Sequence, residues 1–255
     1  MNAVFFYDKT FDGLLSAVFQ AYSTKRFPDR LLKVGDVAPM FIDERITVIT
    51  DPDQAGRVWT GLLNKTDATV RNMLGYVWLS EISGSDELLF RYICKTFDSK
   101  HTVAWNFGDA DVLELTKIAR KVAHEALYIK QFVRFQKSAD GIYVAPIHPE
   151  YNALPLTIAH FSDRFADQQW VIYDTKRKYG YYYNLHEAVE ITLADDNNLL
   201  NGRLNDTAMD DDEKLFQQLW KSYFKAMAIK ERLNPRLHRH NMPTRFWRYL
   251  TEKRI

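Results

Sequence analysis

The stretch Pro155–Asn184, PLTIAHFSDRFADQQWVIYDTKRKYGYYYN, concentrates aromatic, His, Arg and Asp residues more densely than any other segment of the chain. Ile158, Phe161 and Phe165 follow one another at helical spacing, so its first half predicts a short amphipathic helix. Its second half is rich in aromatic and β-branched residues around a polar joint at 175–178, which predicts a two-stranded hairpin. We therefore expect this part of the chain to build a sheet that a helix covers.

Segments on both sides of this stretch extend the pattern. Before it, a long helical pattern at 111–129 leads to two strand-like runs at 132–136 and 142–147, joined by the turn signal Asp140–Gly141. After it come one more strand at 188–193, an exposed acidic loop at 195–212 and an amphipathic helix at 213–233. These elements follow one another along the chain as a hairpin, a helix and a second hairpin. They predict a four- or five-stranded antiparallel sheet with a helix across it.

The beginning of the chain has a different character. AVFFY at 3–7 and ITVIT at 46–50 are short apolar runs, and an amphipathic helix follows each of them. Strand–helix–strand order predicts a parallel pair with a crossover connection. The whole chain is thus predicted to be α+β (mixed α/β). Residues 1–105 form a helix-rich α/β region, and residues 106–255 form the antiparallel sheet with a C-terminal helix and a basic tail, either as two regions or as one compact domain.

Composition excludes several classes of protein. A single cysteine among 255 residues rules out a disulfide framework, and also a Cys-rich metal centre held by this chain alone. We see neither a signal peptide nor an apolar run long enough to span a membrane, and we expect a cytoplasmic protein. No GxGxxG, Walker or HExxH motif occurs, so the sequence predicts no cofactor and no metal.

Charge is distributed unevenly along the C-terminal third. Residues 187–213 hold nine acidic residues and one base, whereas residues 221–255 hold ten bases and two acidic residues. The tail interleaves cations with aromatic rings, which is typical of phosphate binding combined with base stacking. Its candidate nucleic-acid contacts are Arg236, Arg239, Arg245, Trp247 and Arg248. A structural alternative is that the tail packs on the chain's own acidic segment.

The motifs HFSDRFADQQWVIYDTKRKYGYYYN, FVRFQKSADGIYVAPIHPEYNALPL and NPRLHRHNMPTRFWRYL, with the opening FYDKTFDGLLSAVFQAY, resemble an uncharacterised bacterial family of probable DNA metabolism or DNA repair proteins. The resemblance covers nearly the whole chain. Members of that family occur as separate proteins next to a radical SAM protein, or are fused to a domain similar to uracil-DNA glycosylases. The resemblance therefore implies a pathway and a partner, and it implies no particular reaction. The residues that match its motifs are Arg134, Phe135, His160, Phe161, Arg164, Phe165, Trp170, Asp174, Arg177, Asn234, Pro235, Arg236, Pro243 and Trp247.

A first hypothesis is an accessory or repair factor that holds DNA and takes a base into an aromatic pocket at the hairpin. In it, His160 would act as general acid or base and Asp174 would orient it. The nucleic-acid contacts outside the tail would be Arg134, Arg164, Trp170, Arg177 and Tyr182.

Two further hypotheses remain open. One is a protein–protein adaptor without chemistry, which would need an exposed apolar patch. The other is a small-molecule enzyme that uses the pocket around His160 and Arg164.

Overall fold

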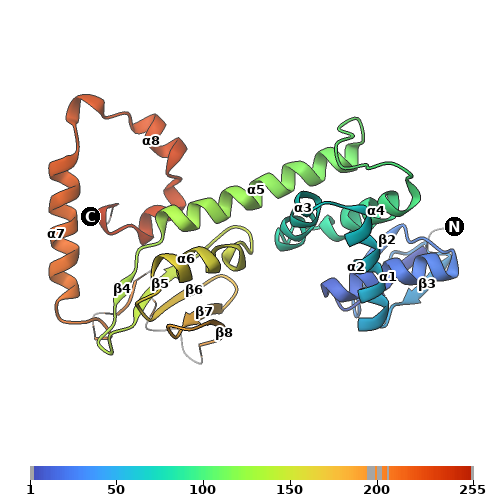
Figure 1. The fold of residues 1–255 in the computed structure, drawn as a ribbon, viewed down its shortest axis with the longest axis horizontal. Helices are drawn as coiled ribbons and strands as arrows, with labels where there is room; N and C mark the ends of the chain where they lie inside the picture. The colour runs from blue at the N-terminus through green and yellow to red at the C-terminus, as the bar shows by residue number, and fades with distance from the viewer. Residues whose placement is uncertain (1–2, 194–198, 200–202, 206, 254–255) are drawn as a thin grey trace. The chain divides into compact units, whose positions relative to one another are not determined.

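The computed structural model describes residues 3–193, 199, 203–205 and 207–253 (Figure 1). The chain divides into two compact units, Met1–Ala123 and His124–Ile255, each built from helices and a small sheet. The predicted α+β class is therefore confirmed. The division between the units falls inside the long helix α5 (Ala110–Phe132), and the boundary at 105/106 stays a prediction.

The first unit contains a three-stranded parallel sheet. Its strands are β1 (Ala3–Tyr7), β2 (Arg30–Lys33) and β3 (Glu44–Thr47), in the order β2-β1-β3. The predicted parallel pairing of β1 with the run at 46–50 is confirmed, because Phe5 pairs with Ile46. Strand β2 was not predicted, since RLLK is short and Leu31 is its only buried residue.

The first unit also contains the beginning of α5 and four further helices, α1 (Phe11–Thr24), α2 (Pro52–Lys65), α3 (Ala68–Leu79) and α4 (Ser85–Asp98). The first three begin at capping side chains of Thr10, Asp51 and Asp67, each of which accepts from a backbone N–H of the first turn. Their apolar faces and the central strand β1 form one continuous core. Burial of these faces, more than helix propensity, therefore holds the unit together.

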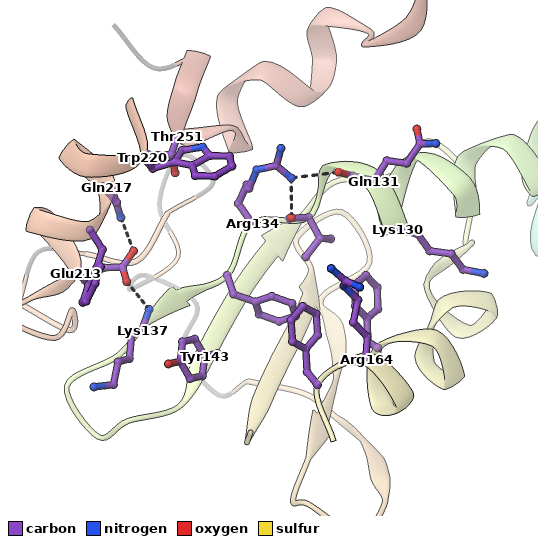
Figure 2. A pocket seen from close by; sticks show the side chains of 15 residues that line it. Lys130, Gln131, Arg134, Lys137, Tyr143, Arg164, Glu213, Gln217, Trp220 and Thr251 are labelled. Carbon is purple, nitrogen blue, oxygen red and sulfur yellow. Dashed lines mark hydrogen bonds between the residues drawn. The ribbon is translucent and has the colours of Figure 1, made fainter. Parts of the chain in front are cut away.

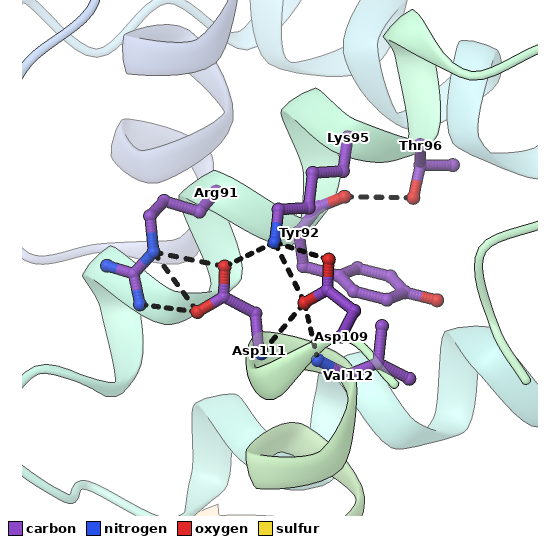
Figure 3. A network of polar contacts seen from close by, with 7 residues as sticks. All are labelled: Arg91, Tyr92, Lys95, Thr96, Asp109, Asp111 and Val112. Carbon is purple, nitrogen blue, oxygen red and sulfur yellow. Dashed lines mark hydrogen bonds and ion pairs between the residues drawn. The ribbon is translucent and has the colours of Figure 1, made fainter. Parts of the chain in front are cut away.

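A network of charged side chains joins the end of α4 to the start of α5 (Figure 3). Lys95 Nζ lies 2.7 Å from a carboxylate oxygen of Asp109 and 2.7 Å from one of Asp111, and Arg91 Nη2 lies 2.8 Å from Asp111. Asp109 also accepts from the backbone N–H groups of Asp111 and Val112, so it caps α5. These contacts therefore fix the start of α5 against α4.

The second unit is built on a five-stranded sheet. Its strands are β4 (Gln136–Lys137), β5 (Tyr143–Ile147), β6 (Trp170–Asp174), β7 (Tyr179–Tyr183) and β8 (Ala188–Ile191), hydrogen-bonded in that order. The predicted hairpins β4–β5 and β6–β7 are antiparallel. The pairing of β5 with β6 is parallel, so the expectation of a purely antiparallel sheet was wrong on this point. The reason is the helix between these strands, which returns the chain to the end where β5 began.

Helices connect the strands of this sheet and follow it along the chain. Between β5 and β6 lie η1 (Leu154–Thr157) and α6 (Ile158–Arg164). Helix α6 is the helix that the spacing of Ile158, Phe161 and Phe165 predicted. After the sheet come α7 (Glu213–Met227), η3 (Lys230–Arg232), α8 (Pro235–Asn241), η4 (Thr244–Tyr249) and η5 (Thr251–Lys253). Helix α7 is shorter than the predicted 213–233.

Trp170 organises the face of the sheet that α6 covers (Figure 1). Its ring is fully buried, stacks on Tyr183 with centroids 5.3 Å apart, and contacts the ring of Phe161 at 6.2 Å. On the opposite face, Tyr173 packs against a segment that includes Leu204 and Met209. The predicted acidic loop at 195–212 lies partly outside the described residues.

Candidate functional site

The second unit contains a cavity of about 750 Å³ beside α6, β4 and α7 (Figure 2). This volume is within the usual range for ligand pockets, about 300–1,000 Å³. Its lining residues are Lys130, Gln131, Val133, Arg134, Phe135, Lys137, Tyr143, Phe161, Arg164, Phe165, Glu213, Phe216, Gln217, Trp220 and Thr251. Aromatic and basic side chains predominate among them, and we call it the aromatic pocket.

Phenylalanine rings form the inner wall of the aromatic pocket. The ring of Phe135 makes edge contacts with Phe165 at 5.2 Å and with Phe161 at 5.9 Å. Phe161 is buried, and it is held from behind by Trp170. Two residues of α7 complete the wall: Phe216, whose side chain is 62% exposed, and Trp220, which is 41% exposed. The pocket thus offers ring surfaces that solvent reaches.

Four cations line the pocket, and they differ in their partners. Arg134 is paired with Glu252 at 2.8 Å and Lys137 with Asp210 at 2.9 Å. In the described part of the chain, neither Lys130 nor Arg164 is paired with a carboxylate. The guanidinium of Arg164 lies over the ring of Phe165, 5.7 Å from its centroid. Positive charge beside exposed rings therefore remains available to an anionic ligand.

Among the described residues that line the pocket, Glu213 is the one carboxylate, and its interactions are structural. It accepts from the backbone N–H of Lys137 at 3.1 Å and from the side-chain amide of Gln217 at 2.8 Å. The first of these bonds joins the beginning of α7 to β4, and the second lies within α7, as Figure 2 shows. The carboxylate is thereby occupied in holding the wall, and the lining keeps a net positive charge.

His160 and Asp174, the predicted catalytic pair, lie in different surroundings. His160 is exposed on α6, where its ring contacts that of Phe161. Asp174 is fully buried at the end of β6 and accepts from the backbone N–H of Lys176 at 2.8 Å and from Arg177 Nη1 at 2.9 Å. No hydrogen bond joins the two side chains in the described residues. Asp174 therefore holds the β6–β7 turn, and the catalytic pairing stays a prediction.

Three residues predicted to contact nucleic acid have other surroundings. The ring of Trp170 is enclosed in the core, where no base can reach it. Tyr182 alternates with Tyr183 along β7, so it points to the sheet face opposite Trp170. Arg177 is paired with Asp174, with 11% of its side chain exposed. None of them lines the aromatic pocket, whereas the predicted Arg134 and Arg164 do.

The tail residues lie on the short helical turns after α7. Arg236 and Arg239 are exposed on α8. Arg245 is paired with both Glu125 and Glu150, and the guanidinium of Arg248 lies 4.7 Å from the ring centre of Tyr249. Trp247 is half-buried and donates from its indole nitrogen to the carbonyl of Met242. The carboxylates that hold Arg245 belong to α5 and to the loop after β5, outside the acidic segment at 187–213.

Burial raises the pKa of Glu125, against the effect of its bond from the backbone N–H of Glu150 and the charge of Arg245. The imidazole of His148 has a lowered pKa, because it is partly buried and faces Arg248, Lys176 and Arg177, which outweigh Asp174. The surroundings of His148 are thus electropositive.

Sequence reasoning missed the other pocket residues, above all Lys130, Lys137, Phe216 and Trp220. The last two belong to the predicted amphipathic helix, and no site role was assigned to its apolar face. The signal that could have found them is the density of rings on that apolar face, FQQLWKSYF, so close to a basic segment.

In the described part of the chain, no group of three or more His, Cys, Asp or Glu side chains could hold a metal ion. None of its helices combines the length and the apolar character that crossing a membrane requires.

Fold and pocket together define an α+β protein with an open aromatic cavity edged by arginine and lysine. The model of a family described as a domain of unknown function, DUF4130, matches residues 83–252, more than half of the chain, and the chain belongs to this family. No curated protein matches. Among solved structures, a pGpG-specific phosphodiesterase, PggH from Vibrio cholerae, matches with 11% identity and a TM-score of 0.35, over 89% of this chain and 100% of the other. So low a score supports no statement about fold or activity.

Proposed function

We propose that the second unit binds single-stranded or locally opened nucleic acid and takes a base into the aromatic pocket. The observation that carries the proposal is the combination of exposed rings and unpaired cations in one cavity. Base–aromatic stacking contributes about 1–3 kcal/mol per base, and nearby cations hold the backbone phosphates. Phe216 and Trp220 supply the exposed rings, and Lys130 and Arg164 supply the cations.

The wall of the pocket suits stacking better than chemistry. The carboxylate of Glu213 is engaged in two hydrogen bonds, and the described residues that line the cavity include no histidine. Recognition without a reaction is therefore the role that the lining favours. A place in DNA repair beside a radical SAM partner is implied by the family resemblance alone, and we include it in the proposal on that ground.

Binding of a fluorescent single-stranded oligonucleotide, followed by anisotropy at two salt concentrations, tests the proposal. Arg164→Gln removes an exposed cation, and Phe216→Ala removes an exposed ring. We expect Phe216→Ala to weaken binding about fivefold to a hundredfold at both salt concentrations, in line with the loss of one stacked base. We expect Arg164→Gln to weaken binding and also to reduce its salt dependence.

Leu215→Ala and Arg120→Gln are the matched controls. Leu215 is 54% exposed on the same helix and Arg120 is exposed on α5, and neither lines the pocket. Both controls should bind like the wild type. The proposal is wrong if the control variants weaken binding as much as the pocket variants, or if the wild type does not bind at low salt.

The exposed apolar face of α7 favours a second candidate, a protein-binding role. Leu215, Leu219, Tyr223 and Met227 repeat at helical spacing and are each more than half exposed. A contiguous exposed apolar stripe of this kind marks an interaction surface. Lys214, Lys221 and Lys225 belong to the same helix, so the partner that fits is a protein with an apolar groove bordered by acidic residues.

The radical SAM protein implied by the resemblance is the partner we propose for this face. Leu219→Asp together with Tyr223→Asp should abolish co-purification of the two proteins. Those changes should leave oligonucleotide binding intact, because neither residue lines the pocket. Unchanged co-purification would exclude α7 as the contact surface.

A further inference from the structure

The guanidinium of Arg134 is held from two directions at the edge of the aromatic pocket. Its Nη2 lies 2.8 Å from a carboxylate oxygen of Glu252. Its Nη1 donates to the carbonyl oxygens of Gln131 at 3.1 Å and Val133 at 3.0 Å, the two bonds drawn from Arg134 in Figure 2. These contacts fix the plane of the guanidinium, so its remaining N–H groups point in fixed directions.

The Nε–H group of Arg134 takes part in none of these contacts. Nε is buried and has no hydrogen-bond partner in the described part of the chain, although 26% of the whole side chain is exposed. A buried donor without an acceptor costs free energy, and most buried polar groups in folded proteins are therefore paired. Because Arg134 lines a cavity, a ligand in that cavity can supply the acceptor.

Trp220, one of the exposed rings of the pocket, lies next to this donor. Its indole Nε1 donates to the second oxygen of Glu252 at 2.9 Å, so one carboxylate holds Arg134 and Trp220 together. In Figure 2, Trp220 lies on one side of the guanidinium, and Gln131, which accepts from Nη1, lies on the other. A base that stacks on Trp220 therefore brings its edge within reach of Arg134.

Arg134 restricts the chemistry of that edge more than the uncharged polar side chains of the pocket do. A guanidinium has donors only and stays protonated, so the ligand atom that faces Nε has to be an acceptor. The amide of Gln217 and the hydroxyl of Tyr143 also line the pocket, but groups of these kinds can donate as well as accept. The carboxylate of Glu213 already accepts two hydrogen bonds. Rejection of a base edge that carries a donor therefore depends on Arg134.

We propose that the Nε–H of Arg134 makes the aromatic pocket selective for keto bases, and this inference rests on the proposed function. Keto bases are thymine, uracil and guanine, whose edge away from the sugar carries a carbonyl oxygen where cytosine and adenine carry an amino group. A carbonyl oxygen completes a charge-assisted bond with Nε–H. An amino group at the same place sets two donors against each other and leaves the buried one unpaired.

Fluorescence anisotropy with short single-stranded oligonucleotides tests the inference on the full chain. In each probe abasic sites flank a single base, so that no other base can stack in the pocket. The base is uracil or cytosine in one matched pair, and hypoxanthine or adenine in the other. We expect the keto member of each pair to bind about tenfold or more tighter, as for one hydrogen bond to a buried charged donor.

Arg134→Lys keeps the positive charge and removes the Nε–H group, so it should abolish the preference within each pair. Glu252→Gln is the matched control, because it breaks the ion pair of Arg134 and leaves Nε–H in place. It should weaken binding of all the probes and preserve the preference. The inference is overturned if the wild type prefers neither keto base, if Arg134→Lys keeps the preference, or if Glu252→Gln removes it as completely as Arg134→Lys.

Nuclear magnetic resonance of the Arg134 Nε–H group gives a second readout, on the wild-type chain. The signal is identified by its loss in Arg134→Lys. Saturation with the uracil probe should shift this signal and slow its exchange with water, because the donor becomes hydrogen-bonded. Saturation with the cytosine probe should not slow the exchange. The same response to both probes would contradict the inference.

These measurements separate the inference from the proposed function. Binding that depends on Phe216 but shows no base preference overturns the inference and leaves the aromatic pocket as proposed. If the wild type does not bind even an unmodified single-stranded oligonucleotide at low salt, the proposed function fails, and the inference fails with it.

Discussion

Glu252 anchors the C-terminal segment to the rest of the second unit. Its side chain is 2% exposed, and its two oxygens accept from Arg134 Nη2 at 2.8 Å and from Trp220 Nε1 at 2.9 Å. Since Arg134, Trp220 and the neighbouring Thr251 all line the aromatic pocket, this carboxylate also fixes the shape of the pocket. Glu252→Gln is the change that tests its role.

The loss of stability expected for Glu252→Gln follows from these contacts. An amide can accept one of the two hydrogen bonds with its oxygen, but its NH₂ group then faces the other donor. Removing one partner of a buried ion pair costs about 3–5 kcal/mol. Arg134 is 26% exposed and keeps the carbonyls of Gln131 and Val133 as acceptors, so the cost should lie below that range, at about 2–3 kcal/mol.

Because the chain has two compact units, a local measurement is needed. Native-state hydrogen exchange of peptides from 131–137 and 244–253 gives the local unfolding free energy. We would compare Glu252→Gln, Arg134→Met and the double variant. The pair should be coupled by about 2 kcal/mol. Effects that add within about 0.5 kcal/mol would refute the view that this ion pair holds the segment.

Three further predictions concern stability. Gly180→Ala should lower the melting temperature by several degrees, because the added Cβ would lie 2.4 Å from the Ile172 carbonyl oxygen. Gly56→Ala should raise the melting temperature slightly, because Gly56 lies inside α2 and the added Cβ would meet no atom within 4 Å. The ion pairs with Arg91 and Lys95 lower the pKa values of Asp111 and Asp109. The stability that these pairs contribute is therefore present above about pH 4 and is lost as pH falls further. In urea unfolding, the free energy of unfolding of Lys95→Met should depend less on acid pH than that of the wild type. Burial opposes ionisation of Glu252, but the bonds from Arg134 and Trp220 have the larger effect and lower its pKa. Protection of residues 244–253 from hydrogen exchange should therefore fall at acid pH in the wild type and not in Glu252→Gln.

Local patterns predicted many elements because their causes are local. Three of these patterns could be recognised in the sequence: the helical spacing in α6, the apolar runs of β1 and β3, and the Asp140–Gly141 turn of the β4–β5 hairpin. Strand β2 has too few apolar residues to be seen. The parallel pairing of β5 and β6 depends on how the intervening helix directs the chain, and the spacing of residues within each strand does not contain that information.

The site was predictable only in part, for the same reason. Arg134 and Arg164, two of the residues predicted to contact nucleic acid, line the aromatic pocket, and their role stays a prediction. Trp170 and Asp174 are buried by long-range pairing, which makes them structural despite their suggestive neighbours. The apolar face of α7 was visible as a pattern, yet a pattern cannot tell whether such a face meets a core, a pocket or solvent.

Photo-crosslinking of a single-stranded oligonucleotide that carries one 5-iodouracil tests the central claim most directly, because it reports which ring the base contacts. After irradiation of the bound complex, mass spectrometry locates the crosslinked peptide. Base binding in the aromatic pocket predicts attachment at Phe165, Phe216 or Trp220, and crosslinks to α7 should be lost in Phe216→Ala together with Trp220→Leu. Attachment at the exposed rings of the first unit, Trp105 or Phe107, or no attachment to the pocket while the oligonucleotide is bound, would contradict it.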